Sequence, residues 1–135
     1  MRILILEDNE ERNTYFTKHL RADHDFTIAT TSDEMIKLLK ENKKIDILFL
    51  DHDLGGEEMV DSHYKNTGYQ VTKWLLASQF RPKIGCAVVH SCNPVGAENM
   101  LGILNQINID SYQIPFPSLD LPGLLPFLVL AATND

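Results

Sequence analysis

Residues 45–56 read IDILFLDHDLGG, an apolar run that ends in two carboxylates flanking an imidazole. Residues 45–50 are apolar apart from Asp46, and Asp51, His52 and Asp53 follow directly. Continuous apolar runs of this length are typical of strands covered on both faces, as in parallel sheets. The stretch therefore predicts a buried strand whose carboxyl end carries reactive polar groups.

Similar runs recur along the chain and alternate with helical patterns. Strands are predicted at residues 3–6, 26–30, 47–50, 87–89 and 112–116, and helices at 9–22, 31–42, 67–80 and 93–107. Thr31 and Glu34 have the spacing of a capping box, and Asn93 precedes a proline that suits the first helical position. Strand and helix in alternation predict an α/β fold, a doubly wound five-stranded parallel sheet with right-handed crossovers.

The 135 residues suffice for one hydrophobic core, so 1–135 is interpreted as a single domain. Residues 118–135 form its irregular end, because Pro122, Gly123 and Pro126 interrupt the helical pattern. A short helix is expected from about Pro126 to Ala132. The alternative for this apolar segment is contact with a protein partner or with a second copy as a homodimer.

Charge and hydropathy exclude several classes of partner. The net charge of −7 disfavours binding to bulk nucleic acid or to anionic membrane surfaces. The chain lacks an apolar stretch of about 18 residues, and its N-terminus turns acidic after six residues, unlike a signal peptide. A cytoplasmic protein is expected, and a small phosphorylated ligand held by a metal ion is compatible with the charge.

Polar side chains follow three of the predicted strands where each strand ends. They are Glu7, Asp8 and Asn9 after the first strand, Asp51, His52 and Asp53 after the third, and His90, Ser91 and Asn93 after the fourth. Ligands of open α/β sheets bind at these carboxyl ends. Carboxylates held close together need a cation or a proton. Glu7, Asp8, Asp51 and Asp53 are therefore predicted to bind Mg²⁺ or another divalent cation, although the first group could also simply cap a helix.

His52 and His90 are candidates for proton transfer near neutral pH, with Ser91 as a donor to a phosphoryl oxygen. Zinc binding with the neighbouring aspartates is a less favoured alternative, because no short-spaced ligand pair supports it. A purely structural His90, bonded to a loop carbonyl, is a further alternative.

Two loops that open predicted helices are candidates for phosphate binding. Thr67 and Gly68 begin one helix, and Asn93 and Gly96 begin the next. Helix N-termini present unpaired N–H groups to anions. Ordinary helix capping explains each loop equally well.

Three motifs carry a resemblance to a known family. LDHDLGG at 50–56, NTGYQV at 66–71 and VVHSCNPVGAENM at 88–100 make the chain resemble the cyclic-phosphate processing receiver domain. This is a divergent branch of the CheY-like receiver superfamily of bacterial response regulators. The resemblance implies a three-layer flavodoxin-like fold with strand order 2-1-3-4-5. It also implies a magnesium site and action on a cyclic phosphate of a nucleotide or RNA end.

The same resemblance leaves three functions open. Asp51 lies where receivers carry their phospho-accepting aspartate, and Asp53 lies where the backbone helps to coordinate Mg²⁺. Receivers have a lysine followed by a proline after the fifth strand, whereas this chain has Ile114 and Pro115. The missing lysine and the extra histidine favour a metal-dependent phosphoesterase over a phospho-accepting switch. A binding module without turnover is the third alternative.

Overall fold

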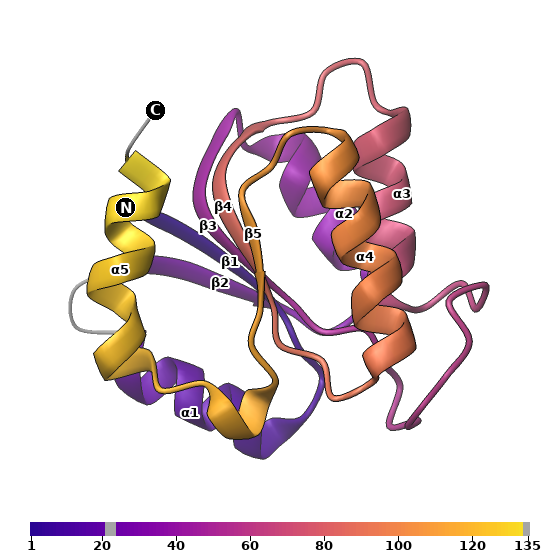
Figure 1. Ribbon diagram of the computed structural model, residues 1–135, viewed down its shortest axis with the longest axis horizontal. Helices are drawn as coiled ribbons and strands as arrows, with labels where there is room; N and C mark the ends of the chain where they lie inside the picture. Colours follow the sequence, from indigo (N-terminus) through magenta and orange to yellow (C-terminus); the bar gives the residue numbers. More distant parts are fainter. Residues whose placement is uncertain (21–23, 134–135) are drawn as a thin grey trace.

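The computed structural model describes residues 1–20 and 24–133, and these form a parallel sheet between two layers of helices (Figure 1). The strands are parallel and lie in the order β2-β1-β3-β4-β5, which confirms the predicted doubly wound α/β fold. Their bounds are β1 Arg2–Leu6, β2 Asp25–Ala29, β3 Lys44–Leu50, β4 Lys83–Val89 and β5 Ser111–Gln113.

The helices divide between the two faces of the sheet. Their bounds are α1 Glu10–Leu20, α2 Ser32–Glu41, α3 Gly68–Ala77, α4 Pro94–Gln106 and α5 Leu121–Thr133. Helices α1 and α5 cover one face, and α2, α3 and α4 cover the other (Figure 1). The predicted caps are present, since Thr31 accepts from Glu34 N and Asn93 accepts from Gly96 N.

The central strand β3 shows why the sheet is buried on both sides. Leu48 and Leu50 pack in the cluster beneath α2, α3 and α4, whereas Ile47 and Phe49 pack in the cluster beneath α1 and α5. Successive side chains of a strand point to opposite faces, so an unbroken apolar run supplies both clusters. All four side chains are fully buried.

Helix α5 begins at Leu121, five residues before the predicted start at Pro126, which lies inside the helix. Pro122 is tolerated because the first N–H groups of a helix have no intrahelical partner. Burial of Leu128 and Ala132 stabilises the helix despite Pro126. The outer face exposes Phe127 and Leu130, so binding of a partner or a second copy there stays a prediction.

Among residues 1–20 and 24–133, no helix combines the length and hydrophobicity needed to cross a bilayer.

Candidate functional site

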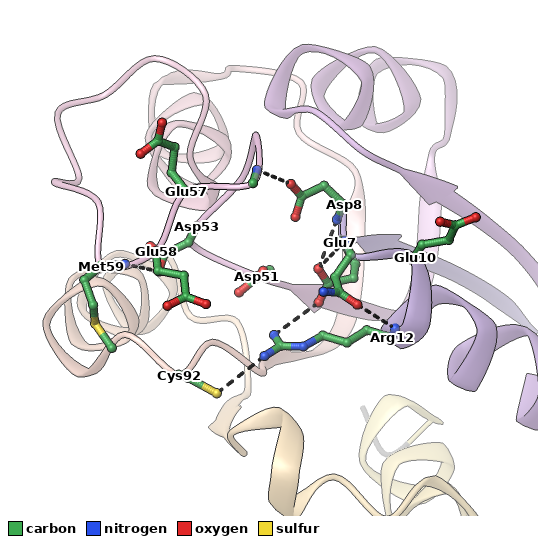
Figure 2. A pocket seen from close by; sticks show the side chains of 12 residues that line it. Glu7, Asp8, Glu10, Arg12, Asp51, Asp53, Glu57, Glu58, Met59 and Cys92 are labelled. Carbon is green, nitrogen blue, oxygen red and sulfur yellow. Dashed lines mark hydrogen bonds and ion pairs between the residues drawn. The ribbon is translucent and has the colours of Figure 1, made fainter.

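A pocket of about 420 Å³ opens at the carboxyl end of the sheet (Figure 2). Its lining comes from the segments that follow β1, β3 and β4 and from α1. The lining residues are Glu7, Asp8, Asn9, Glu10, Arg12, Asp51, Asp53, Gly56, Glu57, Glu58, Met59 and Cys92. All four residues predicted to bind a metal ion therefore lie around one cavity.

Strand pairing brings the groups of three strands together. Leu6 pairs with Leu50, and Leu50 pairs with Val89, so the next residues, Glu7, Asp51 and His90, become neighbours. One potential ligand atom of each lies within 4.8 Å of the other two.

Glu7 and His90 form a buried pair behind the pocket. His90 Nε2 lies 3.0 Å from Glu7 Oε1, and neither side chain is exposed. Burial would raise the pKa of Glu7, but the hydrogen bonds from His90 and from Asn9 N, together with the charge of Arg12, bring it below its usual value. Burial lowers the pKa of His90, which favours a neutral ring that donates to an ionised Glu7. His90 thus bonds a carboxylate and not a loop carbonyl, and its ring does not line the pocket.

Among the residues that line the pocket, Asp51 has the most strongly shifted pKa. Burial, followed by repulsion from Glu7, raises its pKa to about 8, although its Oδ1 accepts a hydrogen bond from His52 N at 2.9 Å. A carboxyl group with this pKa keeps its proton at neutral pH unless a cation replaces that proton. The donor set of oxygen atoms around Asp51 therefore fits a hard divalent cation.

Asp8 and Asp53 are held by the loop that follows β3. Gly55 and Gly56 have φ values of 74° and 77°, and this left-handed turn lets Gly56 N donate to Asp8 Oδ2 at 2.9 Å. Asp53 accepts from Met59 N at 2.7 Å and also from side chains of the loop and of the segment that caps α4. The pKa of Asp53 is lowered because hydrogen bonds, first from His52 and then from Asn93, outweigh the effect of burial.

The predicted proton-transfer residues His52 and Ser91 do not line the acidic pocket. His52 is fully buried between Asp53 and Ser62. Ser91 is 1% exposed, and its Oγ accepts from Asn93 N. Their catalytic roles stay predictions.

The predicted phosphate-binding residues also lie outside the lining of this pocket. Thr67 is buried and donates to Tyr64 O, and Gly68 N donates to His52 O. Gly96 N donates to Asn93 Oδ1, the side-chain oxygen that caps α4. The helix N–H groups of Gly68 and Gly96 are thus engaged within the chain, and phosphate binding by these four residues remains a prediction.

The sequence interpretation missed several residues of the pocket lining, and Arg12 is the cationic one among them. Its guanidinium lies 3.5 Å from Glu7 Oε1 and 4.8 Å from the centre of the Phe116 ring. Burial would lower its pKa, but Glu7 and Asp51 together raise it, so the group is firmly cationic. Its position early in α1, directly after the first acidic segment, was the available signal.

Comparisons with known proteins support the fold described above. A search among solved structures matches the signal receiver domain of a putative LuxO repressor protein from Vibrio parahaemolyticus, with 16% identity and a TM-score of 0.69. That match covers 98% of this chain and 90% of that chain. The BeF₃-activated N-terminal receiver domain of RstA from Klebsiella pneumoniae matches with 19% identity and a TM-score of 0.66, covering 98% of this chain and 99% of that one. These likenesses show the fold.

A search of curated protein sequences finds no match. A family model, described as the cyclic-phosphate processing receiver domain, matches residues 2–106. That range contains the pocket residues Glu7, Asp8, Arg12, Asp51 and Asp53. With its receiver fold and this acidic pocket, the chain belongs to the cyclic-phosphate processing receiver domain family.

Proposed function

We propose that the acidic pocket binds Mg²⁺ and processes a cyclic phosphate on a nucleotide or RNA end. The observation that carries this proposal is the convergence of Glu7, Asp8 and Asp51 on one cavity that also holds the guanidinium of Arg12. Clustered carboxylates bind the cation, and a nearby cation of the chain suits a phosphate. The description of the family supports the same class of substrate.

Glu7, Asp8 and Asp51 are the residues that would hold the metal ion. Both oxygens of Asp53 already accept hydrogen bonds, from His52, Asn93 and Met59 N. Both oxygens of Glu7 do so as well, from His90, Asp8 N and Asn9 N, so Asp8 and Asp51 have the freer oxygens. When bound, Mg²⁺ supplies Lewis-acid polarisation of a phosphoryl oxygen.

Arg12 and the Glu7–His90 pair supply the chain's own chemistry. Arg12 binds phosphoryl oxygens through charge-assisted hydrogen bonds, a role that the absent receiver lysine leaves open. His90 donates to Glu7 and keeps that carboxylate ionised and oriented. A proton from His90 would reach the pocket only through Glu7, because the imidazole is fully buried.

The direct test is incubation of the protein with a nucleoside 2′,3′-cyclic phosphate and Mg²⁺, with the products separated by chromatography. The proposal predicts steady formation of the ring-opened monophosphate, which EDTA abolishes. A substrate recovered unchanged contradicts the proposed reaction. If that substrate nevertheless raises the melting temperature, the pocket is a binding module without turnover.

Replacing Arg12 by glutamine is expected to raise KM for the cyclic phosphate by about tenfold to a hundredfold, because one charge-assisted contact to phosphate is lost. Lys18→Gln removes an equal charge from an exposed position on α1 and is the matched control. Steady-state kinetics measure both variants. An unchanged KM in Arg12→Gln, or an equal rise in Lys18→Gln, contradicts direct phosphate binding by Arg12.

The second candidate function is a phospho-accepting switch. It is favoured by the position of Asp51, whose side chain borders the pocket beside Arg12. A small-molecule phosphodonor separates the two functions. Stable label on Asp51 indicates the switch, whereas continuous release of phosphate indicates turnover.

A further inference from the structure

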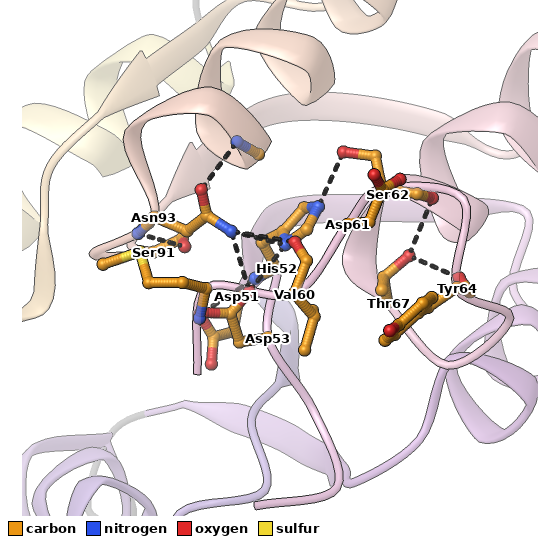
Figure 3. Close-up of polar contacts among 12 residues, drawn as sticks. Asp51, His52, Asp53, Val60, Asp61, Ser62, Tyr64, Thr67, Ser91 and Asn93 are labelled. Atoms are coloured by element: carbon orange, nitrogen blue, oxygen red, sulfur yellow. Dashed lines mark hydrogen bonds and ion pairs between the residues drawn. The ribbon is translucent and has the colours of Figure 1, made fainter. Parts of the chain in front are cut away.

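A second constellation of reactive side chains lies in the loop between β3 and α3. His52 Nδ1 is 2.8 Å from Asp53 Oδ1, and His52 Nε2 is 2.9 Å from Ser62 Oγ (Figure 3). A carboxylate only accepts, so Asp53 selects the tautomer with the proton on Nδ1. The lone pair on Nε2 then faces the hydroxyl of Ser62. The three side chains therefore have the order of hydrogen bonds that activates a serine nucleophile.

Asn99 completes the hydrogen bonding of this serine. Its Nδ2 lies 3.0 Å from Ser62 Oγ and donates to it. A hydroxyl has one proton and can accept as well. Ser62 Oγ can thus accept from Asn99 and donate its proton to His52, which leaves the proton directed at the base.

Ser62 borders a cavity that is separate from the acidic pocket. This cavity has a volume of about 360 Å³ and shares no lining residue with the first. It is lined by Val60, Asp61, Ser62, His63, Tyr69, Val95, Gly96 and Asn99. Ser62 is 9% exposed as a residue, and it is one of the residues that line this cavity. The wall mixes apolar and polar groups, and the carboxylate of Asp61 would repel a phosphate, so a small neutral ester suits it better.

Neighbouring residues hold the relay of Ser62, His52 and Asp53 in place. Gly96 lies against the His52 ring, and a Cβ at this position would overlap the ring. The carbonyl of Ser62 accepts from Gln70 Nε2 at 3.1 Å, and Asn93 Nδ2 donates to Asp53 Oδ1 at 3.0 Å. Each member of the relay is thus held by a neighbour, as preorganised catalytic groups are.

We propose that Ser62, His52 and Asp53 form a second active centre, in which Ser62 attacks small neutral carboxylic esters. The Oγ–carbon bond forms as the hydroxyl proton moves to His52 Nε2. The carbon–oxygen bond of the leaving alcohol then breaks, and that alcohol takes the proton. Water hydrolyses the acyl-serine by the same path. Asp53 is a positioning residue that orients His52, and the reaction uses no metal ion.

The test uses an alkyl fluorophosphonate, which forms a P–O bond to an activated serine and releases fluoride. Trypsin cleavage yields a peptide of residues 45–65, in which Ser62 and Tyr64 are the only residues with a hydroxyl side chain. Fragmentation of this peptide shows which of the two residues carries the label. The proposal predicts label on Ser62 in the unmodified protein. It also predicts a burst of one equivalent of p-nitrophenol from p-nitrophenyl acetate, and EDTA changes neither result.

Variants test the role of each group. Ser62→Ala should lose the label, and His52→Gln should slow labelling by roughly a hundredfold. Ser32→Ala, which removes another buried hydroxyl that donates to the carbonyl of Lys65, is the matched control and should label normally. Melting curves establish that each variant is folded. Absence of label on Ser62 in the unmodified protein, or equal labelling in a folded His52→Gln, overturns the proposal, whatever the outcome at the acidic pocket.

Discussion

Replacing Asp51 by asparagine is expected to stabilise the metal-free protein at pH 8 and above and to abolish its stabilisation by Mg²⁺. The folded state holds the Asp51 pKa at about 8, against an ordinary value of 3.8. Between these pH values the folded state binds a proton that the unfolded state has lost, so the free energy of unfolding falls as pH rises. Asparagine does not ionise, so the variant avoids this decrease in the free energy of unfolding. The decrease amounts to roughly 2–5 kcal/mol above pH 8.

Thermal unfolding from pH 4 to 9, with and without Mg²⁺, measures both effects. Glu41→Gln, at an exposed carboxylate at the end of α2, is the control and should follow the wild-type curve. If Asp51→Asn follows the wild-type curve at every pH, the pKa of Asp51 is not raised in the folded protein. If the variant is still stabilised by Mg²⁺, Asp51 is not a required ligand of the metal ion.

Replacing Gly68 by alanine is expected to cost about 3 kcal/mol or more, because the new Cβ would overlap the backbone carbonyl of Asp51. The new Cβ would also meet the end of the Met100 side chain at 2.8 Å, but that flexible group can move, so the overlap with the Asp51 backbone dominates the cost. Movement of Asp51 would also distort the acidic pocket. Urea unfolding measures the loss of stability.

Gly102 provides the matched control for this substitution. It lies within α4, and a Cβ added there would meet no atom within 4 Å, so Gly102→Ala should stabilise by about 0.5–1 kcal/mol. Equal unfolding midpoints for the two variants would contradict the close packing of α3 against the end of β3.

The sequence predicted the fold well where side-chain pattern alone decides structure. The apolar run before Asp51 predicted β3, and the capping residues Thr31 and Asn93 marked two helices correctly. The start of β4 at Lys83 and the start of α5 at Leu121 were missed. Lys83 pairs with Lys44 at the end of the sheet where polar residues are tolerated, and α5 depends on the tertiary packing of its buried side chains.

The meeting of Glu7, Asp8, Asp51 and Asp53 around one pocket was also predictable, because residues that follow adjacent parallel strands meet at one edge, whereas Glu57 and Glu58 were not foreseen there. The contribution of Arg12 depends on which face of α1 turns towards the sheet. The contact between His52 and Ser62 depends on the path of residues 53–61, and the sequence carries no periodic signal for that path. The features that the sequence interpretation missed depend on contacts between residues far apart in the chain, and not on residue type.

Calorimetric titration of Mg²⁺ into the protein at pH 7, in two buffers of different ionisation enthalpy, tests the central claim most directly. If Glu7 and Asp51 share a cation site, binding should release roughly one proton from Asp51 at pH 7 and little at pH 9. Asp51→Asn should eliminate both the binding heat and the proton release. Absence of binding, or binding with the same heat in both buffers and in Asp51→Asn, would contradict a metal site built on this pair.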